Sequence, residues 1–297
     1  MSNNMNDVGR LNIIGAGKLG QTVGRLWTNS GVLSIGDILN RSHDSTQRAV
    51  DFIGAGRVIK NFEEMRAAEY YLLACPDDQI ETCCQQLVDS GVINTGVVVF
   101  HCSGALNSTL LHSAKEQGAH VASVHPVRSF AHPGLAIEQF PGTYCGMEGH
   151  DEALHKLSII FTALGAVPFA IKPEKKMLYH AASVMACNYL VTLQEISLQA
   201  LEEAGIQRCL GAEILQPLVE GTVKNVFEVG TADALTGPVA RGDAWLVEKQ
   251  LKAVAEWNHE AGELYRMMGL SAVDLAGQKS RVLAPQFDAV LKVLSNK

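Results

Sequence analysis

The chain has 297 residues, 47% of them hydrophobic and 19% charged, and its formal net charge at pH 7 is −7. This composition is typical of a globular protein, the length suggests two domains, and the acidic balance argues against binding to nucleic acid or to a membrane surface. The first ten residues are polar and no apolar stretch is long enough to span a bilayer, so we expect a cytoplasmic protein.

Short apolar runs alternate with amphipathic segments through the first half of the chain. Strands are predicted over 11–14, 35–39, 57–59, 70–74, 97–100, 120–124, 143–147 and 167–171, and helices over 18–30, 46–52, 77–89, 105–117 and 152–164. Such alternation is typical of βαβ units. We therefore expect residues 1–172 to form an α/β Rossmann domain with a mainly parallel sheet.

The pattern changes at Lys172-Pro173, after which no segment predicts a strand. One long helix is expected over 175–204, and further helices over 212–229, 244–268 and 286–294. Residues 173–297 are therefore predicted to form an all-α C-terminal domain.

A glycine-rich segment directly follows the first predicted strand and opens the first predicted helix. It reads Gly15-Ala16-Gly17-Lys18-Leu19-Gly20. Gly15 permits a tight turn, Gly17 lets the backbone approach a pyrophosphate, and Gly20 lets the helix pack on the strand. The free N–H groups at the helix N-terminus favour phosphate there. The segment thus predicts a dinucleotide-binding loop; a glycine-rich turn without a ligand is the alternative.

The end of the second predicted strand indicates which dinucleotide is bound. An NAD site usually carries an acidic residue there, but this chain has Asn40-Arg41-Ser42. Arg41 would attract a ribose 2′-phosphate, which a carboxylate would repel. Asp37 lies too early in the strand to reach the ribose. We therefore expect NADP rather than NAD, unless Arg41 is simply a solvated surface residue.

Several stretches, in this order, resemble a known family. They are GAGKLGQTVGRL, LNRS, LLACPDDQI, HCSGAL, SVHPVRSF, KKMLYHAASVMACNYL and LTGPVARGD, which together span about residues 11 to 245. The chain resembles the family that pairs a Rossmann-like domain with a helical domain of unknown function (number 2520). That family is a relative of the β-hydroxyacid dehydrogenase, 6-phosphogluconate dehydrogenase and pyrroline-5-carboxylate reductase superfamily.

The resemblance carries implications for cofactor, catalysis and assembly. Asn40-Arg41-Ser42 is similar to the NADP-binding sequence of those reductases, and Ala74-Cys75-Pro76 to the turn that passes beside the cofactor. Lys176 matches the catalytic lysine of β-hydroxyacid dehydrogenases. In those enzymes two asparagines follow three and four residues later, whereas this chain has Tyr179 and His180. The resemblance also implies a homodimer formed through the helical domain.

Candidate catalytic and substrate-binding residues surround this predicted cofactor site. Lys176 and His180 lie one helical turn apart on a shared face, so either could transfer a proton during hydride transfer. The alternatives are a solvated lysine and a core histidine bonded to backbone. Substrate-binding candidates are Ser103, Gly104 and His125 beyond predicted strands, Asn188 on the long helix, and Arg241, which could pair with a carboxylate. No spacing of His, Cys or acidic residues predicts a metal site.

These residues predict an NADP(H)-dependent oxidoreductase that acts on a small carbonyl, hydroxy acid or imine. The missing asparagine pair keeps a second class open, a non-catalytic NADP(H)-binding sensor or scaffold. A flavin or deazaflavin user is a further alternative within the enzymes, resting on the generality of Rossmann loops.

Overall fold

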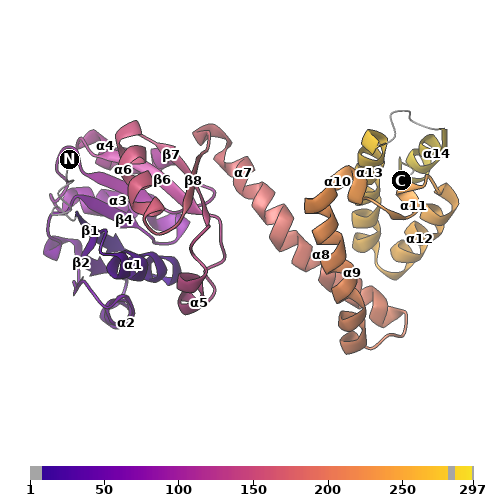
Figure 1. The fold of residues 1–297 in the computed structure, drawn as a ribbon, viewed down its shortest axis with the longest axis horizontal. Coiled ribbons are helices and arrows are strands. Elements are labelled where there is room, and N and C mark those ends of the chain that lie inside the picture. Colours follow the sequence, from indigo (N-terminus) through magenta and orange to yellow (C-terminus); the bar gives the residue numbers. More distant parts are fainter. Residues whose placement is uncertain (1–8, 280–284, 296–297) are drawn as a thin grey trace. The chain divides into compact units, whose positions relative to one another are not determined.

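The computed structural model describes residues 9–279 and 285–295 (Figure 1). The chain divides into two compact units, Met1–Val184 and Met185–Lys297. None of the helices in these described residues has the length and apolar character that crossing a membrane requires.

The first unit is built on one eight-stranded sheet with the strand order β3-β2-β1-β4-β5-β6-β7-β8. Every neighbouring pair is parallel except β6 and β7, which run antiparallel. The strands are β1 Arg10–Ile14, β2 Ser34–Leu39, β3 Arg57–Val58, β4 Tyr70–Leu73, β5 Val98–His101, β6 His120–Pro126, β7 Tyr144–Gly149 and β8 Val167–Ala170. The predicted Rossmann-type sheet is thus confirmed.

Helices lie between these strands and after the last one, mostly at the predicted positions. They are α1 Lys18–Ser30, α2 His43–Ile53, α3 Ile80–Asp89, α4 His112–Glu116, α5 Pro133–Glu138, α6 Asp151–Thr162 and α7 Lys176–Ser183. The helix predicted over 105–117 is wrong at its start, since a 3-10 turn begins only at Ser108. The reason is local: the Ser103 hydroxyl accepts the backbone N–H groups of Ala105 and Leu106, which holds a turn there.

The two faces of the sheet carry separate cores, because successive strand side chains point to opposite faces. One core contains Phe100 with Trp27 and Phe161, whose three rings pack edge to face. The other contains Tyr71 and Val99. The apolar strands predicted from sequence are therefore buried on both sides, as expected of a parallel sheet.

Only helices follow Ala170 in the described residues, as predicted. After α7 come a π-helical turn Val184–Asn188, α8 Tyr189–Glu203, α9 Arg208–Val229, α10 Thr231–Ala234, α11 Gly237–Ala240, α12 Ala244–Trp257, α13 His259–Lys279 and α14 Pro285–Ser295. The single helix predicted over 244–268 is wrong, because Asn258 divides it. Its side-chain oxygen accepts the N–H of Ala261 and caps α13.

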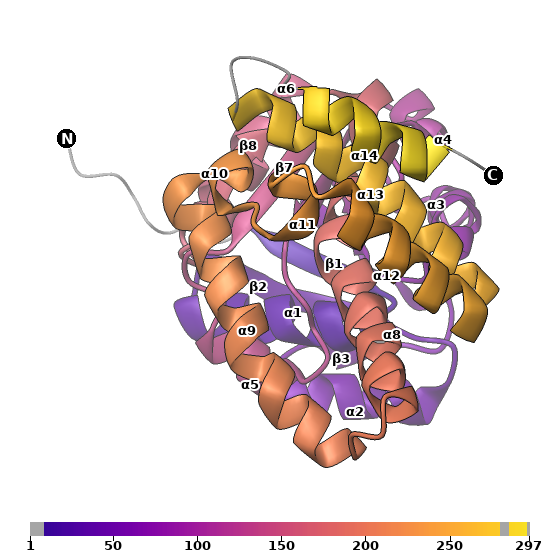
Figure 2. The same ribbon diagram turned by 90° about the vertical axis from the view of Figure 1, so that its right-hand side faces the viewer.

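The second unit has one small core, formed by α12, α13 and α14, which pack together in Figure 2. Phe287, Val273 and Val247 are its central side chains. By contrast, α8 buries no residue and α9 buries only Gly211.

Candidate functional site

The glycine loop connects β1 to α1, and two of its three glycines pack against a neighbouring turn. Gly15 has a φ of +83°, and a Cβ there would lie 2.5 Å from the backbone N of Cys75. A Cβ at Gly20 would lie 3.3 Å from the Cβ of Ala74. Gly15 is therefore required by its backbone conformation and by its packing against the Ala74-Cys75-Pro76 turn, and Gly20 packs tightly against the same turn.

Gly17 differs from Gly15 and Gly20 because nothing among the described residues requires a glycine there. Its φ is −75°, which any residue can adopt, and an added Cβ would meet only the Gly15 carbonyl oxygen, at 3.9 Å. The residue is exposed and caps α1. Its bare backbone is the cradle that a pyrophosphate needs at a helix N-terminus. Of the other loop residues, Ala16 is buried, Leu19 half-buried and Lys18 exposed.

The turn after β2 presents one uncommitted cation. Asn40 is held in the turn, where its side chain donates to the Ser45 carbonyl at 3.0 Å. Ser42 caps α2 by accepting the N–H of Ser45. Arg41, between them, is exposed and makes no hydrogen bond or ion pair with any residue that the structure describes. Its guanidinium is thus free to bind an anion near the N-terminus of α2.

The buried Asp37 carboxylate is paired with two arginines that are partly exposed. Arg57 contacts its carboxylate at 2.8 Å and Arg66 at 2.7 Å, and Asp37 is fully buried. Burial alone would raise the pKa of Asp37, but hydrogen bonds from both arginines outweigh burial and lower the pKa to about 2. This carboxylate is already paired within the protein, as expected for an acid that does not serve a ribose.

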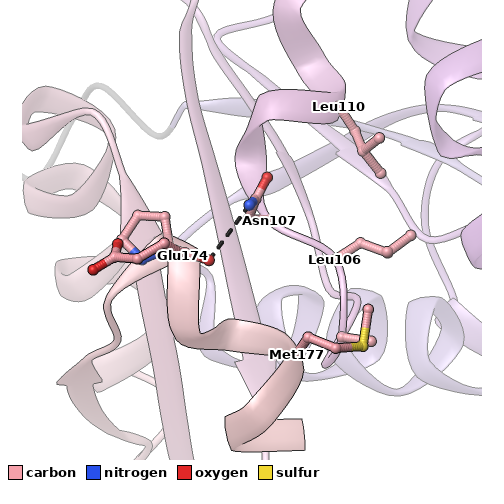
Figure 3. Close-up of a pocket in the computed structure, with 7 residues that line it drawn as sticks. Leu106, Asn107, Leu110, Glu174 and Met177 are labelled. Atoms are coloured by element: carbon pink, nitrogen blue, oxygen red, sulfur yellow. Dashed lines mark hydrogen bonds between the residues drawn. The ribbon is translucent and has the colours of Figure 1, made fainter.

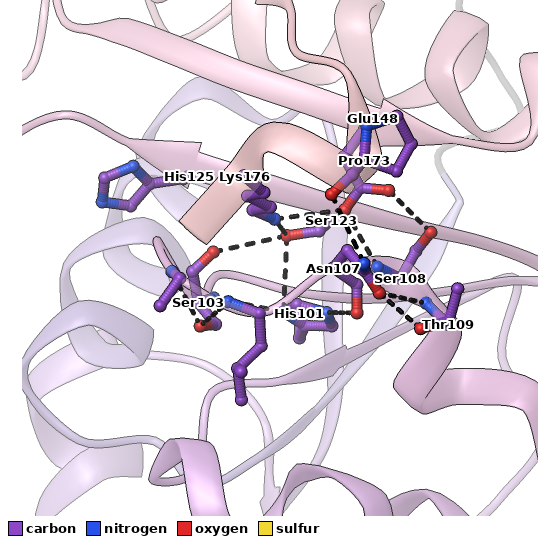
Figure 4. A network of polar contacts seen from close by, with 12 residues as sticks. His101, Ser103, Asn107, Ser108, Thr109, Ser123, His125, Glu148, Pro173 and Lys176 are labelled. Carbon is purple, nitrogen blue, oxygen red and sulfur yellow. Dashed lines mark hydrogen bonds and ion pairs between the residues drawn. The ribbon is translucent and has the colours of Figure 1, made fainter. Parts of the chain in front are cut away.

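A row of polar residues crosses the sheet where β5, β6 and β7 meet (Figure 4). His101 is the register partner of Ser123, and Ser123 is the register partner of Glu148. All three are buried, and they lie side by side on the sheet face that carries Tyr71 and Val99. Sequence reasoning missed Ser123 and Glu148, because each is a single polar residue in a strand and only the register brings them together.

Lys176, the first residue of α7, lies against this row. Its ammonium donates to the Ser123 hydroxyl and lies 3.1 Å from Glu148 Oε1, and both charged side chains are 1% exposed. The solvated-lysine alternative is therefore wrong. Burial lowers the pKa of Lys176, while the neighbouring Glu148 carboxylate opposes that shift.

His101 and Ser103 complete the buried part of the site. The Ser103 N–H donates to His101 Nδ1 at 3.2 Å, so the imidazole carries its proton on Nε2, which lies 3.2 Å from the Asn107 carbonyl. Burial and the charge of Lys176 lower the pKa of His101 to about 3. The Ser103 hydroxyl donates to Asp77 at 2.9 Å. Burial raises the pKa of the Cys102 thiol, which disfavours a nucleophile there.

Two histidines and a tyrosine gather over Gly104. The Tyr179 hydroxyl lies 2.8 Å from His125 Nδ1, and the rings of His125 and His180 are 5.6 Å apart. A Cβ on Gly104 would lie 2.4 Å from His180 Nδ1 and 2.8 Å from His125 Nε2, so a side chain there would displace the two imidazoles. His180 Nδ1 is buried without a hydrogen-bond partner among the described residues, so the alternative of a backbone-bonded core histidine is wrong for this nitrogen.

The protonation of this group is set by its surroundings. Burial, with the charges of His180 and Lys176, lowers the pKa of His125 to about 4. Burial raises the pKa of Tyr179 to about 12. At neutral pH the site therefore holds a neutral imidazole bonded to a neutral phenol, and each can pass a proton by exchanging donor and acceptor roles.

A cavity of about 180 Å³ lies between the loop after β5 and the start of α7 (Figure 3). Leu106, Leu110 and Met177 form its apolar walls, and Asn107 donates to the Pro173 carbonyl at 3.4 Å beside it. It contains none of the predicted site residues.

The remaining predicted residues lie in the second unit. Asn188 ends the π-helical turn and Arg241 follows α11, and both are exposed. Their role in substrate binding stays a prediction. No group of three or more His, Cys, Asp or Glu side chains in the described residues could hold a metal ion.

The sheet topology and the helices after it define a Rossmann-like protein with a helical C-terminal region. Residues 3–126 match the Rossmann-like domain model, and residues 143–272 match the domain of unknown function DUF2520. The chain thus carries this domain pair, as the sequence resemblance implied. No curated protein matches the chain.

Solved structures share this fold over most of their length. TM1727 from Thermotoga maritima is 28% identical, with a TM-score of 0.72 over 91% of this chain and 99% of that one. BF3122 from Bacteroides fragilis, named as a candidate NADP oxidoreductase, is 18% identical, with a TM-score of 0.70 over 90% and 99%. A Plasmodium falciparum pyrroline carboxylate reductase with NADP bound is 15% identical, with a TM-score of 0.54 over 95% and 98%.

Proposed function

We propose that the protein is an NADP(H)-dependent oxidoreductase that acts on a small carbonyl, hydroxy acid or imine. The observation that carries this proposal is Gly17, whose missing side chain serves no packing purpose and leaves open the backbone that a pyrophosphate would contact. The names of two structures with this fold, an NADP oxidoreductase and an NADP-bound reductase, support the choice of cofactor.

Each part of the cofactor has a proposed contact. The loop from Gly15 to Gly20 would hold the pyrophosphate, and Arg41 would hold the ribose 2′-phosphate, with Asn40 and Ser42 shaping the turn. The Ala74-Cys75-Pro76 turn would flank the cofactor. When bound, NADP(H) supplies the hydride acceptor or donor.

The protein itself would supply the proton that accompanies hydride transfer. His180 is our candidate, because its buried Nδ1 has no hydrogen-bond partner in the described part of the chain and its ring lies beside His125. Tyr179 and His125 form a second proton-carrying pair, and the His125 ring contacts His180. Gly104 and Ser103 would border the substrate at the carboxyl edge of β5.

Calorimetric titration with NADPH and NADH tests the cofactor assignment. Arg41→Ala should weaken NADPH binding by about 10- to 100-fold, as expected for loss of a charged hydrogen bond worth about 1.5–3 kcal/mol, and leave NADH binding unchanged. Gly17→Ala should abolish binding of both without changing the unfolding temperature. Lys115→Ala, which removes an exposed lysine of α4, is the matched control. Absence of heat with either nucleotide in the wild-type protein would refute the assignment.

Turnover separates the enzyme from a sensor. Consumption of NADPH should be followed against a panel of carbonyl compounds and imines, and His180→Ala should reduce kcat by about 10²- to 10⁴-fold on any active substrate. Tight NADPH binding with no turnover on the whole panel would favour a non-catalytic NADP(H)-binding protein instead.

We also propose that a second copy of the chain covers α8 and α9. Leu210, Ile214 and Leu218 are exposed and lie at a four-residue spacing along one stripe of α9. Within the same unit, an apolar groove of about 540 Å³ is lined by residues such as Trp257 and Met268. Light scattering should report a dimer, and Ile214→Lys should shift it towards the monomer. A wild-type monomer at all concentrations would contradict this.

A further inference from the structure

The Lys176 ammonium joins α7 to the sheet through Ser123 and Glu148, and we call these contacts the clamp. It is tied to β6 through Ser123 and to β7 through Glu148, so one side chain joins the first residue of α7 to two strands. Glu148 is itself held by Ser108, whose N–H donates to Oε1 at 2.9 Å and whose hydroxyl donates to Oε2 at 2.8 Å. The loop after β5 therefore joins the same cluster.

A proton-transfer residue must reach the reacting atoms, and the Lys176 ammonium is poorly placed to do so. With 1% of its side chain exposed, it is enclosed among Ser123, Glu148 and His101. A substrate that displaced Glu148 from the ammonium would leave this buried carboxylate without its counter-ion, which is costly.

The position of the clamp explains the geometry seen over Gly104. Tyr179 and His180 follow Lys176 by three and four residues, so they lie about one turn further along α7 on neighbouring faces. Fixing the first residue of α7 fixes the rotation of this turn. That rotation places the Tyr179 hydroxyl against His125 and His180 Nδ1 against Gly104.

We infer that Lys176 and Glu148 are positioning residues: a buried ion pair that sets the rotation of α7 and thereby aims Tyr179 and His180 at the site. The inference rests on the proposed function only for what the aimed residues do. The placement of α7 by the ion pair is independent of any substrate.

Single and double substitutions separate a clamp from a catalytic lysine. Lys176→Met and Glu148→Gln should each lower the midpoint of thermal unfolding by roughly 10 °C, because each leaves one buried charge unpaired. The double variant removes both charges, and its glutamine can still accept from Ser108. Its midpoint should recover most of this loss. Lys175→Met, a neighbouring exposed lysine, is the control and should change nothing.

Two further readouts report on positioning. NMR signals of the His125 and His180 rings should move in both single variants and return towards wild type in the double variant. Once a substrate is known, kcat of the double variant should stay within about tenfold of wild type. Loss of a proton donor would instead lower kcat by about 10²- to 10⁴-fold.

Two outcomes would overturn the inference. One is a double variant that is as unstable as the single variants, with displaced histidine signals. The other is a double variant with recovered stability and native histidine signals but turnover reduced more than 100-fold, which would make Lys176 catalytic. Failure of NADPH to bind the wild-type protein would instead contradict the proposed function. The unfolding and NMR results would still test the clamp.

Discussion

The two units of the chain bury their apolar side chains to very different extents. The first unit encloses Trp27, Tyr71 and Phe100 completely on the two faces of its sheet. Among the described residues of the second unit, the buried core side chains come from α12, α13 and α14, while Phe227 on α9 is 86% exposed. A helix gains most of its stability from packing an apolar face. The first unit thus has an extensive core of its own, whereas α8 and α9 bury almost none of their residues.

The largest expected effect tests how tightly the first unit is packed at its cofactor loop. Gly15→Ala places a methyl group 2.5 Å from the Cys75 backbone at a φ of +83°. Combined strain and overpacking should destabilise the protein by about 4 kcal/mol, measured by denaturant unfolding. Gly17→Ala is the matched control, and an equal loss of stability in both variants would mean that the open surface at Gly17 has been misread.

A smaller expected effect tests whether the helices of the second unit differ in how much each side chain contributes to stability. Phe287→Ala, in the α12–α14 core, should cost about 3 kcal/mol and speed hydrogen exchange in those helices. Phe227→Ala should change stability by less than about 0.5 kcal/mol at low protein concentration. A loss that appears for Phe227→Ala only at high concentration would indicate that a second copy covers α9. Similar losses for both variants in the monomer would contradict the comparison.

The smallest expected effect concerns acid titration of the first unit. Because the folded-state pKa of Asp37 is lowered from 3.8 to about 2, its stabilisation is fully present above pH 4 and is lost as the pH falls towards 2. The loss should be about 2 kcal/mol. Denaturant unfolding at a series of pH values measures it, and Asp37→Asn should remove this dependence. An unchanged slope in that variant would assign the acid sensitivity elsewhere.

His101 should add to acid sensitivity at a higher pH. Its folded-state pKa is lowered to about 3, so the unfolded chain binds a proton first and stability declines as the pH falls below 6.5. This decline should be confined to the first unit, where the buried imidazole lies.

Local sequence signals were sufficient to predict many helices and strands of this protein. The helix over Lys18–Ser30 has the predicted bounds because its glycine loop and Gly31 stop are both local. The helix predicted over 105–117 began too early because a serine hydroxyl captured the first N–H groups, and such competition leaves no periodic trace. The break at Asn258 was missed for the same reason.

The row of polar residues in the candidate site could not be predicted from the sequence. His101, Ser123 and Glu148 are separated by more than twenty residues each, and only the pairing register of β5, β6 and β7 makes them neighbours. The sequence alone determined the glycine loop, the change from βα units to helices, and the position of Arg41 after β2, because these depend on short-range spacing. The tertiary structure decided that Lys176 is buried and paired, since long-range contacts set its surroundings.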